Sequence, residues 1–89
     1  MISHTSERFR KAYAALPKQV KKQAREAYKL FKEDPYYPGL NFKKVHAIKP
    51  IYSIRVSIDY RALGIQKGNE IIWFWIGTHS EYDKLLQQL

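Results

Sequence analysis

The chain has 89 residues and no cysteine, and 16 Lys and Arg against 8 Asp and Glu give it a formal net charge of +8. This length indicates a single domain, and the lack of cysteine excludes disulfide bonds and cysteine-ligated metals. No apolar run approaches the roughly 18 residues that span a bilayer, and the N-terminal segment lacks a signal-peptide core, so we expect a cytoplasmic protein. The positive charge favours polyanionic partners such as RNA, DNA or an acidic protein. The alternative is a basic protein without such a partner.

Two helices are predicted in the first third of the chain. Helical spacing of apolar residues indicates a first helix over residues 6–16, capped by Thr5 or Ser6. Pro17 cannot continue that helix but fits the first position of another, so it marks a corner between the two. The second helix ends at Asp34–Pro35 and has a basic outer face, which is usually a solvated one. Its predicted inward-facing residues are Val20, Ala24, Ala27, Tyr28 and Phe31.

The rest of the chain is predicted to form strands. Apolar and polar residues alternate from Tyr52 to Ile58, which indicates a strand with one buried face and one open face that carries Arg55. Residues 60–66 and 70–76 flank a credible hairpin turn at residues 67–69. The run 71–76 is apolar on both faces, as in a central strand that is covered on each side. A weaker strand is expected over residues 41–47, and residues 2–4 are a candidate edge strand.

A short C-terminal helix completes the predicted fold, with Ser80 and Asp83 as its capping-box pair. Helices followed by strands predict an α+β domain. We expect two N-terminal helices packed on a small, mainly antiparallel sheet of about four strands, with residues 1–89 as one domain. The helical spacing at the C-terminus involves Tyr82, Leu85, Leu86 and Leu89.

Several common site types are missing from the sequence. There is no Gly-rich phosphate loop, no HExxH and no GxSxG motif, and neither the histidines nor the acidic residues have the spacing of a metal site. We therefore expect no metal and no cofactor. RNA can be cleaved without a metal because its own 2′-OH attacks the adjacent phosphate. The protein then has to stabilise the charge on the phosphorane oxygens and to move two protons.

Four residues near the ends of the predicted strands fit this chemistry. Arg55 and Arg61 are suited to bind phosphate, because a guanidinium stays charged and donates in a bidentate way. His79 is the candidate general acid or base, and Tyr82 is the candidate to orient the 2′-OH or to stack on a base. Each has a structural alternative. Arg55 can be a solvated strand residue, Arg61 can pair with Asp59, His79 can be an ordinary turn residue and Tyr82 can belong to a helix start.

A second basic group precedes the predicted Arg55 strand, where it would extend a positive surface across the sheet. Contacts of this kind neutralise a nucleic-acid backbone and give affinity without sequence specificity. The group consists of Lys43, Lys44, His46 and Lys49.

Taken together, these motifs resemble the RelE/ParE superfamily of small toxins from bacterial type II toxin–antitoxin systems. The resemblance covers nearly the whole chain and includes the strand IYSIRV, the strand DYRAL and the terminal IGTHSEYD. It implies a compact antiparallel sheet with two N-terminal helices against it. By resemblance, Arg61 is the phosphate-binding arginine and Arg55 is a basic position on the preceding strand. His79 and Tyr82 match a basic residue and a tyrosine at the C-terminal end of the sheet.

RelE-like members cut mRNA in the ribosomal A site without metal, by attack of the 2′-OH. The resemblance therefore implies a ribosome-dependent endoribonuclease with mRNA and ribosome as partners and a small acidic antitoxin that neutralises it. Lys43 and Lys44 would contact the RNA backbone or ribosomal RNA. ParE-like relatives use the same scaffold to poison DNA gyrase. We expect the ribonuclease because His79 and Tyr82 are present, and a gyrase poison or a basic nucleic-acid-binding relative without nuclease activity is the alternative.

Overall fold

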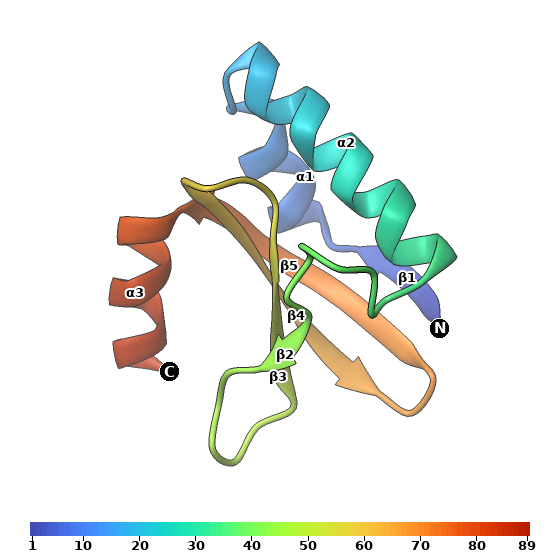
Figure 1. The fold of residues 1–89 in the computed structure, drawn as a ribbon. Helices are drawn as coiled ribbons and strands as arrows, with labels where there is room; N and C mark the ends of the chain where they lie inside the picture. The colour runs from blue at the N-terminus through green and yellow to red at the C-terminus, as the bar shows by residue number, and fades with distance from the viewer.

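Three helices enclose a five-stranded sheet in the computed structural model, which describes residues 1–89. Helices α1 and α2 cover one face of the sheet, and α3 lies on the other face (Figure 1). The predicted α+β class is confirmed, with five strands rather than about four. The elements are, in chain order, β1 (Ile2–Thr5), α1 (Glu7–Ala14), α2 (Lys18–Glu33), β2 (Lys43–Lys44), β3 (Ile51–Arg55), β4 (Tyr60–Lys67), β5 (Glu70–Thr78) and α3 (His79–Gln88).

The strands lie in the order β1-β5-β4-β3-β2, and only the β1–β5 pair is parallel. The candidate edge strand at residues 2–4 forms as β1 and is the fifth strand. The weak strand expected over residues 41–47 is reduced to Lys43–Lys44. Strands β4 and β5 are joined by a two-residue turn in which Gly68 has a φ of 60°, a conformation that glycine adopts readily.

The helical hairpin begins and turns close to where the sequence predicts. Ser6 caps α1, because its Oγ accepts a hydrogen bond from the Phe9 N–H at 3.1 Å. Helix α1 ends at Ala14, two residues before the predicted end, and Pro17 is the N-cap of α2. Of the five predicted inward-facing residues of α2, four are buried and Tyr28 is partly buried.

The larger core lies between the helical hairpin and the sheet. Phe31 of α2 meets Trp73 of β5 edge to face, with ring centroids 5.1 Å apart. The indole Nε1–H of Trp73 donates to Ser3 Oγ at 3.0 Å, so this buried polar group has a partner. The other members of the core are Ala24, Ala27, Leu40, Ile54, Ala62, Ile71 and Ile76.

The face of the sheet that the sequence predicted to be open is partly covered by α3. Ser53 is only 2% exposed, because Tyr82 of α3 packs on Ile51 and Leu63 beside it. The predicted burial of Ile58 was also wrong: β3 ends at Arg55, and Ile58 lies in the following loop with 72% of its surface exposed. Beyond the reach of α3, Ile72 is 42% exposed, so β5 is not covered on both faces along its whole length.

A β-bulge decides which side chains of β5 face α3. Leu63 pairs with Trp75, but the next residue, Gly64, pairs with Trp73, so Phe74 is an extra residue in β5. Phe74 and Trp75 therefore both pack in the smaller cluster under α3, while Trp73 packs in the larger core. Simple alternation cannot predict this arrangement.

Candidate functional site at the start of α3

Helix α3 begins with a capping box that fixes the position of its first residue, His79. The Oγ1 of Thr78 accepts a hydrogen bond from the Glu81 N–H at 3.2 Å, and Glu81 Oε1 accepts from the Thr78 N–H at 3.0 Å. The hydrogen bonds from Thr78 hold the pKa of Glu81 below its ordinary value. The predicted pair of Ser80 and Asp83 was wrong, because the helix begins before Ser80.

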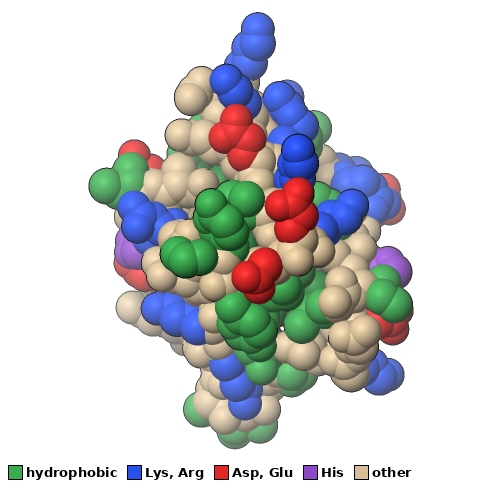
Figure 2. Space-filling model, turned by 45° about the vertical axis from the view of Figure 1, so that its right-hand side comes forward, with side chains coloured by type: hydrophobic (Ala, Val, Ile, Leu, Met, Phe, Trp, Pro, Cys, Tyr) green, Lys and Arg blue, Asp and Glu red, His purple; other side chains and the backbone are tan.

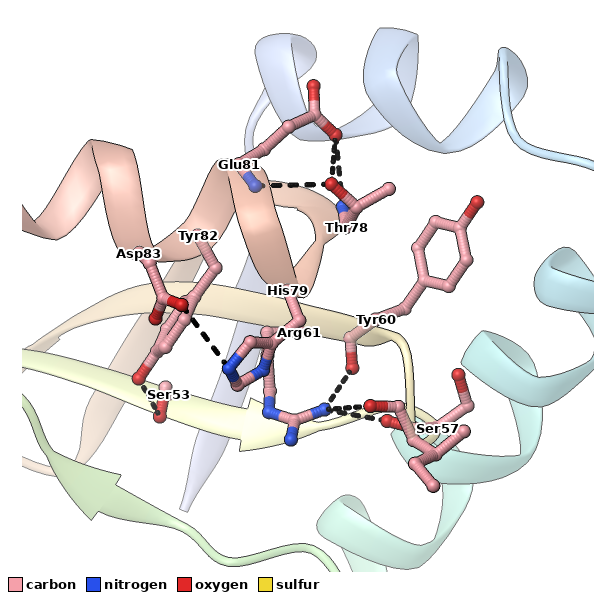
Figure 3. Close-up of polar contacts among 10 residues, drawn as sticks. Ser53, Ser57, Tyr60, Arg61, Thr78, His79, Glu81, Tyr82 and Asp83 are labelled. Atoms are coloured by element: carbon pink, nitrogen blue, oxygen red, sulfur yellow. Dashed lines mark hydrogen bonds and ion pairs between the residues drawn. The ribbon is translucent and has the colours of Figure 1, made fainter.

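Arg61 is anchored by the loop between β3 and β4. Its Nη1 donates to the carbonyl oxygens of Ser57 at 2.7 Å, Tyr60 at 3.0 Å and Ile58 at 3.3 Å (Figure 3). Asp59 is therefore not its partner. A guanidinium carries five N–H groups, and those on Nε and Nη2 of Arg61 make no hydrogen bond within the chain. The side chain is held in place and still has donors to offer.

His79 is attached to the same loop through its backbone. Its N–H donates to the carbonyl of Asp59 at 2.7 Å, which joins the start of α3 to the β3–β4 loop. The imidazole is 50% exposed, and its Nε2 lies 3.4 Å from Oδ2 of Asp83, one helical turn further on (Figure 3). An imidazole and a guanidinium with free donors thus stand at the same end of the sheet.

Arg55 is the residue of β3 that pairs with Arg61 of β4. The two residues are directly opposite one another across β3 and β4, so their Cβ atoms lie on the same face of the sheet. Part of Arg55 also borders a hollow next to α2. Neither arginine forms an ion pair with an acidic side chain. Like charges at opposite positions repel, and a bound anion would relieve that repulsion.

Tyr82 lies below this surface. Its side chain is 7% exposed, and its hydroxyl donates to Oγ of the buried Ser53 at 3.2 Å. The ring lies 5.7 Å from the His79 ring and 6.5 Å from Trp75, measured between centroids. In this arrangement Tyr82 joins α3 to β3 and supports His79 from beneath, and neither its ring nor its hydroxyl reaches the exposed surface.

The structure does not bring the second basic group together. Lys43 and Lys44 are exposed on the edge strand β2, but Lys43 pairs with Ser53 and Lys44 with Tyr52, so they point to opposite faces. Only Lys43 shares the face of Arg61. Figure 2 likewise shows Lys and Arg side chains spread around one face of the molecule rather than gathered in one stripe.

His46 has a structural role within its loop. Its Nε2 donates to the Leu89 carbonyl at 2.9 Å, and its Nδ1 accepts from the N–H groups of Ile48 at 3.1 Å and Lys49 at 2.9 Å. These bonds require the neutral ring with its proton on Nε2. Lys49 is exposed beside this loop.

Asp83 is a residue of the site that the sequence pattern did not indicate. It was assigned to a helix cap, but it lies beside the His79 imidazole. The signal was present, since residues four apart in a helix face each other. No group of three or more His, Asp or Glu side chains comes together in the structure, and none of its helices has the length and apolar character needed to cross a bilayer.

The model of the ParE-like toxin domain family matches residues 18–84, a range that includes Arg55, Arg61 and His79. The chain belongs to the ParE-like toxin domain family. The resemblance to RelE/ParE toxins is thereby confirmed, and the protein is a toxin of a toxin–antitoxin system. A comparison with curated proteins found no match.

Several solved structures share the fold of this ParE-like domain. The RelB–RelE antitoxin–toxin complex from Methanococcus jannaschii aligns with a TM-score of 0.73 at 20% identity, over 91% of this chain and 96% of that chain. The YoeB/ParE toxin from Agrobacterium tumefaciens gives 0.65 at 10% identity, over 89% and 99%. Protein HP0894 from Helicobacter pylori gives 0.64 at 19% identity, over 90% and 96%. At these identities the comparison concerns the fold alone.

Proposed function

We propose that this toxin is a metal-independent endoribonuclease that cleaves mRNA on the ribosome, by attack of a 2′-OH on the adjacent phosphate. One observation carries the proposal. The half-exposed imidazole of His79 and the partly unused guanidinium of Arg61 are both fixed to the β3–β4 loop, at one end of the sheet. An acid–base group beside a rigid cation is what this reaction requires of a protein.

Arg61 would bind the phosphate that is attacked. Because three backbone carbonyls hold Nη1, the guanidinium is already oriented before RNA binds, and Nε–H and Nη2–H can donate to two phosphate oxygens. Arg55, opposite Arg61, would add positive charge as the phosphorane forms. Such preorganised donors stabilise a transition state without a cost of reorganisation at the moment of reaction.

His79 would exchange a proton with the 2′-OH or with the leaving 5′-oxygen. The Asp83 carboxylate, 3.4 Å from Nε2, favours the tautomer that carries its proton on Nε2. The lone pair on Nδ1 is then free to accept a proton from RNA. We assign Asp83 as the residue that orients His79 and Tyr82 as the residue that supports it, rather than as a base-stacking surface.

Lys43 and Lys44 would contact the RNA backbone or ribosomal RNA from the exposed edge strand β2. Such contacts weaken as salt concentration rises. The other expected partner is a small acidic antitoxin, which suits a chain with a net charge of +8. The Methanococcus jannaschii relative was solved in complex with its antitoxin, RelB.

The direct test is cleavage of mRNA in a purified translation system, read by mapping 5′ ends. The variant His79→Ala is expected to lose about 100-fold or more in cleavage rate, the range of general acid–base catalysis. The matched control is His4→Ala, because His4 is also half exposed and lies 3.1 Å from an acidic residue, Glu70, on the far edge of the sheet. Equal losses in both variants, or none in His79→Ala, would contradict the assignment.

A second variant, Arg61→Lys, separates charge from geometry. It keeps the positive charge but cannot hold three carbonyls and a phosphate at once. We expect at least a 10-fold loss of cleavage while the control Arg8→Lys, on an exposed position of α1, cleaves normally. Urea unfolding of both variants shows how much of the effect comes from a weakened β3–β4 loop. A cleavage rate that follows stability alone would remove Arg61 from the mechanism.

The alternative function is poisoning of DNA gyrase, which is favoured by the match to the ParE-like domain. Gyrase-linked DNA breaks with intact mRNA in arrested cells would select it. A basic nucleic-acid-binding protein without nuclease activity would instead give steeply salt-dependent binding and no cleavage products.

A further inference from the structure

A hollow of about 370 Å³ lies at the end of the sheet, between the corner that joins α1 to α2 and the first turn of α3. Leu16 and Pro17 line it at the corner, and the partly buried side chains of Tyr60 and Trp75 line it from β4 and β5. Its volume is within the range of small-ligand sites, roughly 300–1,000 Å³. Apolar and aromatic walls of this kind suit a planar ligand.

The hollow also contains one free hydrogen-bond acceptor, on Glu81. Its Oε1 accepts from the N–H of Thr78 at 3.0 Å and from the Thr78 hydroxyl at 2.8 Å, while Oε2 makes no hydrogen bond within the chain (Figure 3). The carboxylate forms no ion pair. Because the hydrogen bonds from Thr78 hold the pKa of Glu81 below its ordinary value, the group is ionised at neutral pH and can only accept hydrogen bonds.

The hollow is next to Arg61 and His79. In the chain Tyr60 precedes Arg61 and Thr78 precedes His79, and Tyr60 and Thr78 pair with each other across β4 and β5. The Arg61 guanidinium lies 3.0 Å from the Tyr60 carbonyl oxygen. A phosphate bound by Arg61 would therefore lie beside the residue whose side chain lines the hollow, and the base of an adjoining nucleotide would be within reach of it.

We propose that this hollow binds a base of single-stranded RNA next to the cleaved phosphate, and that it selects a base whose amino group donates to Oε2 of Glu81. Cytosine and uracil test this selection because they have nearly the same shape, but cytosine carries an amino donor where uracil carries a carbonyl acceptor. That uracil oxygen would face the carboxylate without a proton between them. The proposal rests on the RNA substrate of the proposed function and adds a base preference to it.

Charge and shape favour a base over a peptide in this hollow. The free carboxylate of Glu81 repels an acidic segment, and the net charge of +8 repels a basic one. Unpaired RNA bases are uncharged, stack on aromatic side chains and form hydrogen bonds through their edges. Tyr60 and Trp75 supply the aromatic surface, and Glu81 supplies the acceptor for one edge.

The first experiment is an NMR titration of the ¹⁵N-labelled chain with two 2′-O-methyl RNA hexamers, one of cytidine and one of uridine. The methyl groups block the nucleophilic 2′-OH, so neither hexamer is cleaved, and both have the same backbone charge. We expect the cytidine hexamer to shift the amides of residues 12–17 and 78–81 and to bind about 10-fold more tightly, the effect of one charged hydrogen bond. Equal affinities, or shifts that avoid both segments, would overturn the proposal.

The variant Glu81→Gln should reverse this preference. Glutamine also suits the third position of a capping box, so its side-chain oxygen can keep the hydrogen bond from Thr78 while its Nε2–H replaces Oε2 as a donor. We expect the uridine hexamer to bind Glu81→Gln more tightly than the cytidine hexamer. The control Glu33→Gln removes the same charge at an exposed position at the end of α2 and should still prefer cytidine. A preference for cytidine that persists in Glu81→Gln would rule out the role of Oε2.

A matched pair of substitutions on α1 tests whether the base enters the hollow. Ala15 lines the hollow, whereas its exposed neighbour Ala14 does not. We expect Ala15→Leu to weaken binding of the cytidine hexamer at least 5-fold and Ala14→Leu to stay within 2-fold, with amide spectra showing that both variants fold. Equal effects of the two substitutions would place the base elsewhere and overturn the proposal.

Mapping of mRNA 5′ ends in a purified translation system separates this proposal from the ribonuclease hypothesis. Glu81→Gln should cut more often beside uridine, relative to cytidine, than the wild type does. Absence of cleavage together with the expected hexamer preferences would refute the ribonuclease hypothesis alone. Normal cleavage without a base preference in either assay would refute only the base-binding role of the hollow.

Discussion

The hydrogen bond between Tyr82 and Ser53 distinguishes a supporting tyrosine from one that takes part in the reaction. Both side chains are almost fully buried, and the only partner of the Ser53 hydroxyl is the hydroxyl of Tyr82. The variant Tyr82→Phe removes one oxygen and leaves the ring in place. If Tyr82 acts from beneath the site, this change should cost stability and leave cleavage nearly intact.

The magnitude follows from the burial of Ser53. Leaving a buried polar group without its partner costs about 1–3 kcal/mol, whereas removing both partners of a buried hydrogen bond can be nearly neutral. We therefore expect Tyr82→Phe to lower the free energy of unfolding by about 1–2 kcal/mol, and Ser53→Ala to lower it by a similar amount. The double variant should lose less than the sum of the two, with a coupling energy of about 1 kcal/mol.

The assay is urea unfolding of the four proteins of this cycle, followed by mRNA cleavage at a temperature where all are folded. Cleavage by Tyr82→Phe should stay within about 3-fold of the wild type, against the roughly 100-fold loss expected for His79→Ala. Unchanged stability together with a large loss of cleavage would refute this reasoning. It would mean that the Tyr82 hydroxyl takes part in the cleavage reaction.

Three further predictions concern the elements that position the site. Thr78→Ala should lower the free energy of unfolding by about 1 kcal/mol through loss of the helix cap, while Thr78→Ser should not; thermal unfolding measures both. The pKa of Glu81 is lowered in the folded protein, so the ionised carboxylate stabilises the folded state. This stabilisation is complete above the pKa of Glu in the unfolded chain, about 4.3, and is lost as the pH falls through the lower pKa of the folded protein. Melting temperatures at pH 7 and pH 3 should therefore differ less for Glu81→Gln than for the wild type, and equal differences would contradict this. Gly77→Ala should destabilise by about 1–3 kcal/mol, because the added Cβ would lie 2.5 Å from Trp75 Cζ2, and an unchanged urea midpoint would contradict it.

The sequence predicted most reliably the features that depend on local periodicity. The apolar stripe of α2 and a hairpin turn within the predicted residues 67–69 both formed, because each is decided by residues close together in the chain. The burial of Ser53 could not be predicted in this way, since a serine alternating with apolar residues looks solvated until α3 packs over it. The exposure of Ile58 depends on where β3 ends, which the pattern does not mark.

Arg61 shows why the candidate site was visible in the sequence while its geometry was not. Strand alternation puts Arg61 on the same face as Leu63, which is fully buried, and the structural alternative for Arg61 was therefore a pair with Asp59. The structure resolves the conflict differently: carbonyl oxygens of the β3–β4 loop bind Nη1, so the charge needs no acidic partner. A carboxylate on Arg61 would have competed with phosphate for the same donors. Backbone oxygens carry only partial charge, and the guanidinium therefore keeps both its orientation and its attraction for an anion.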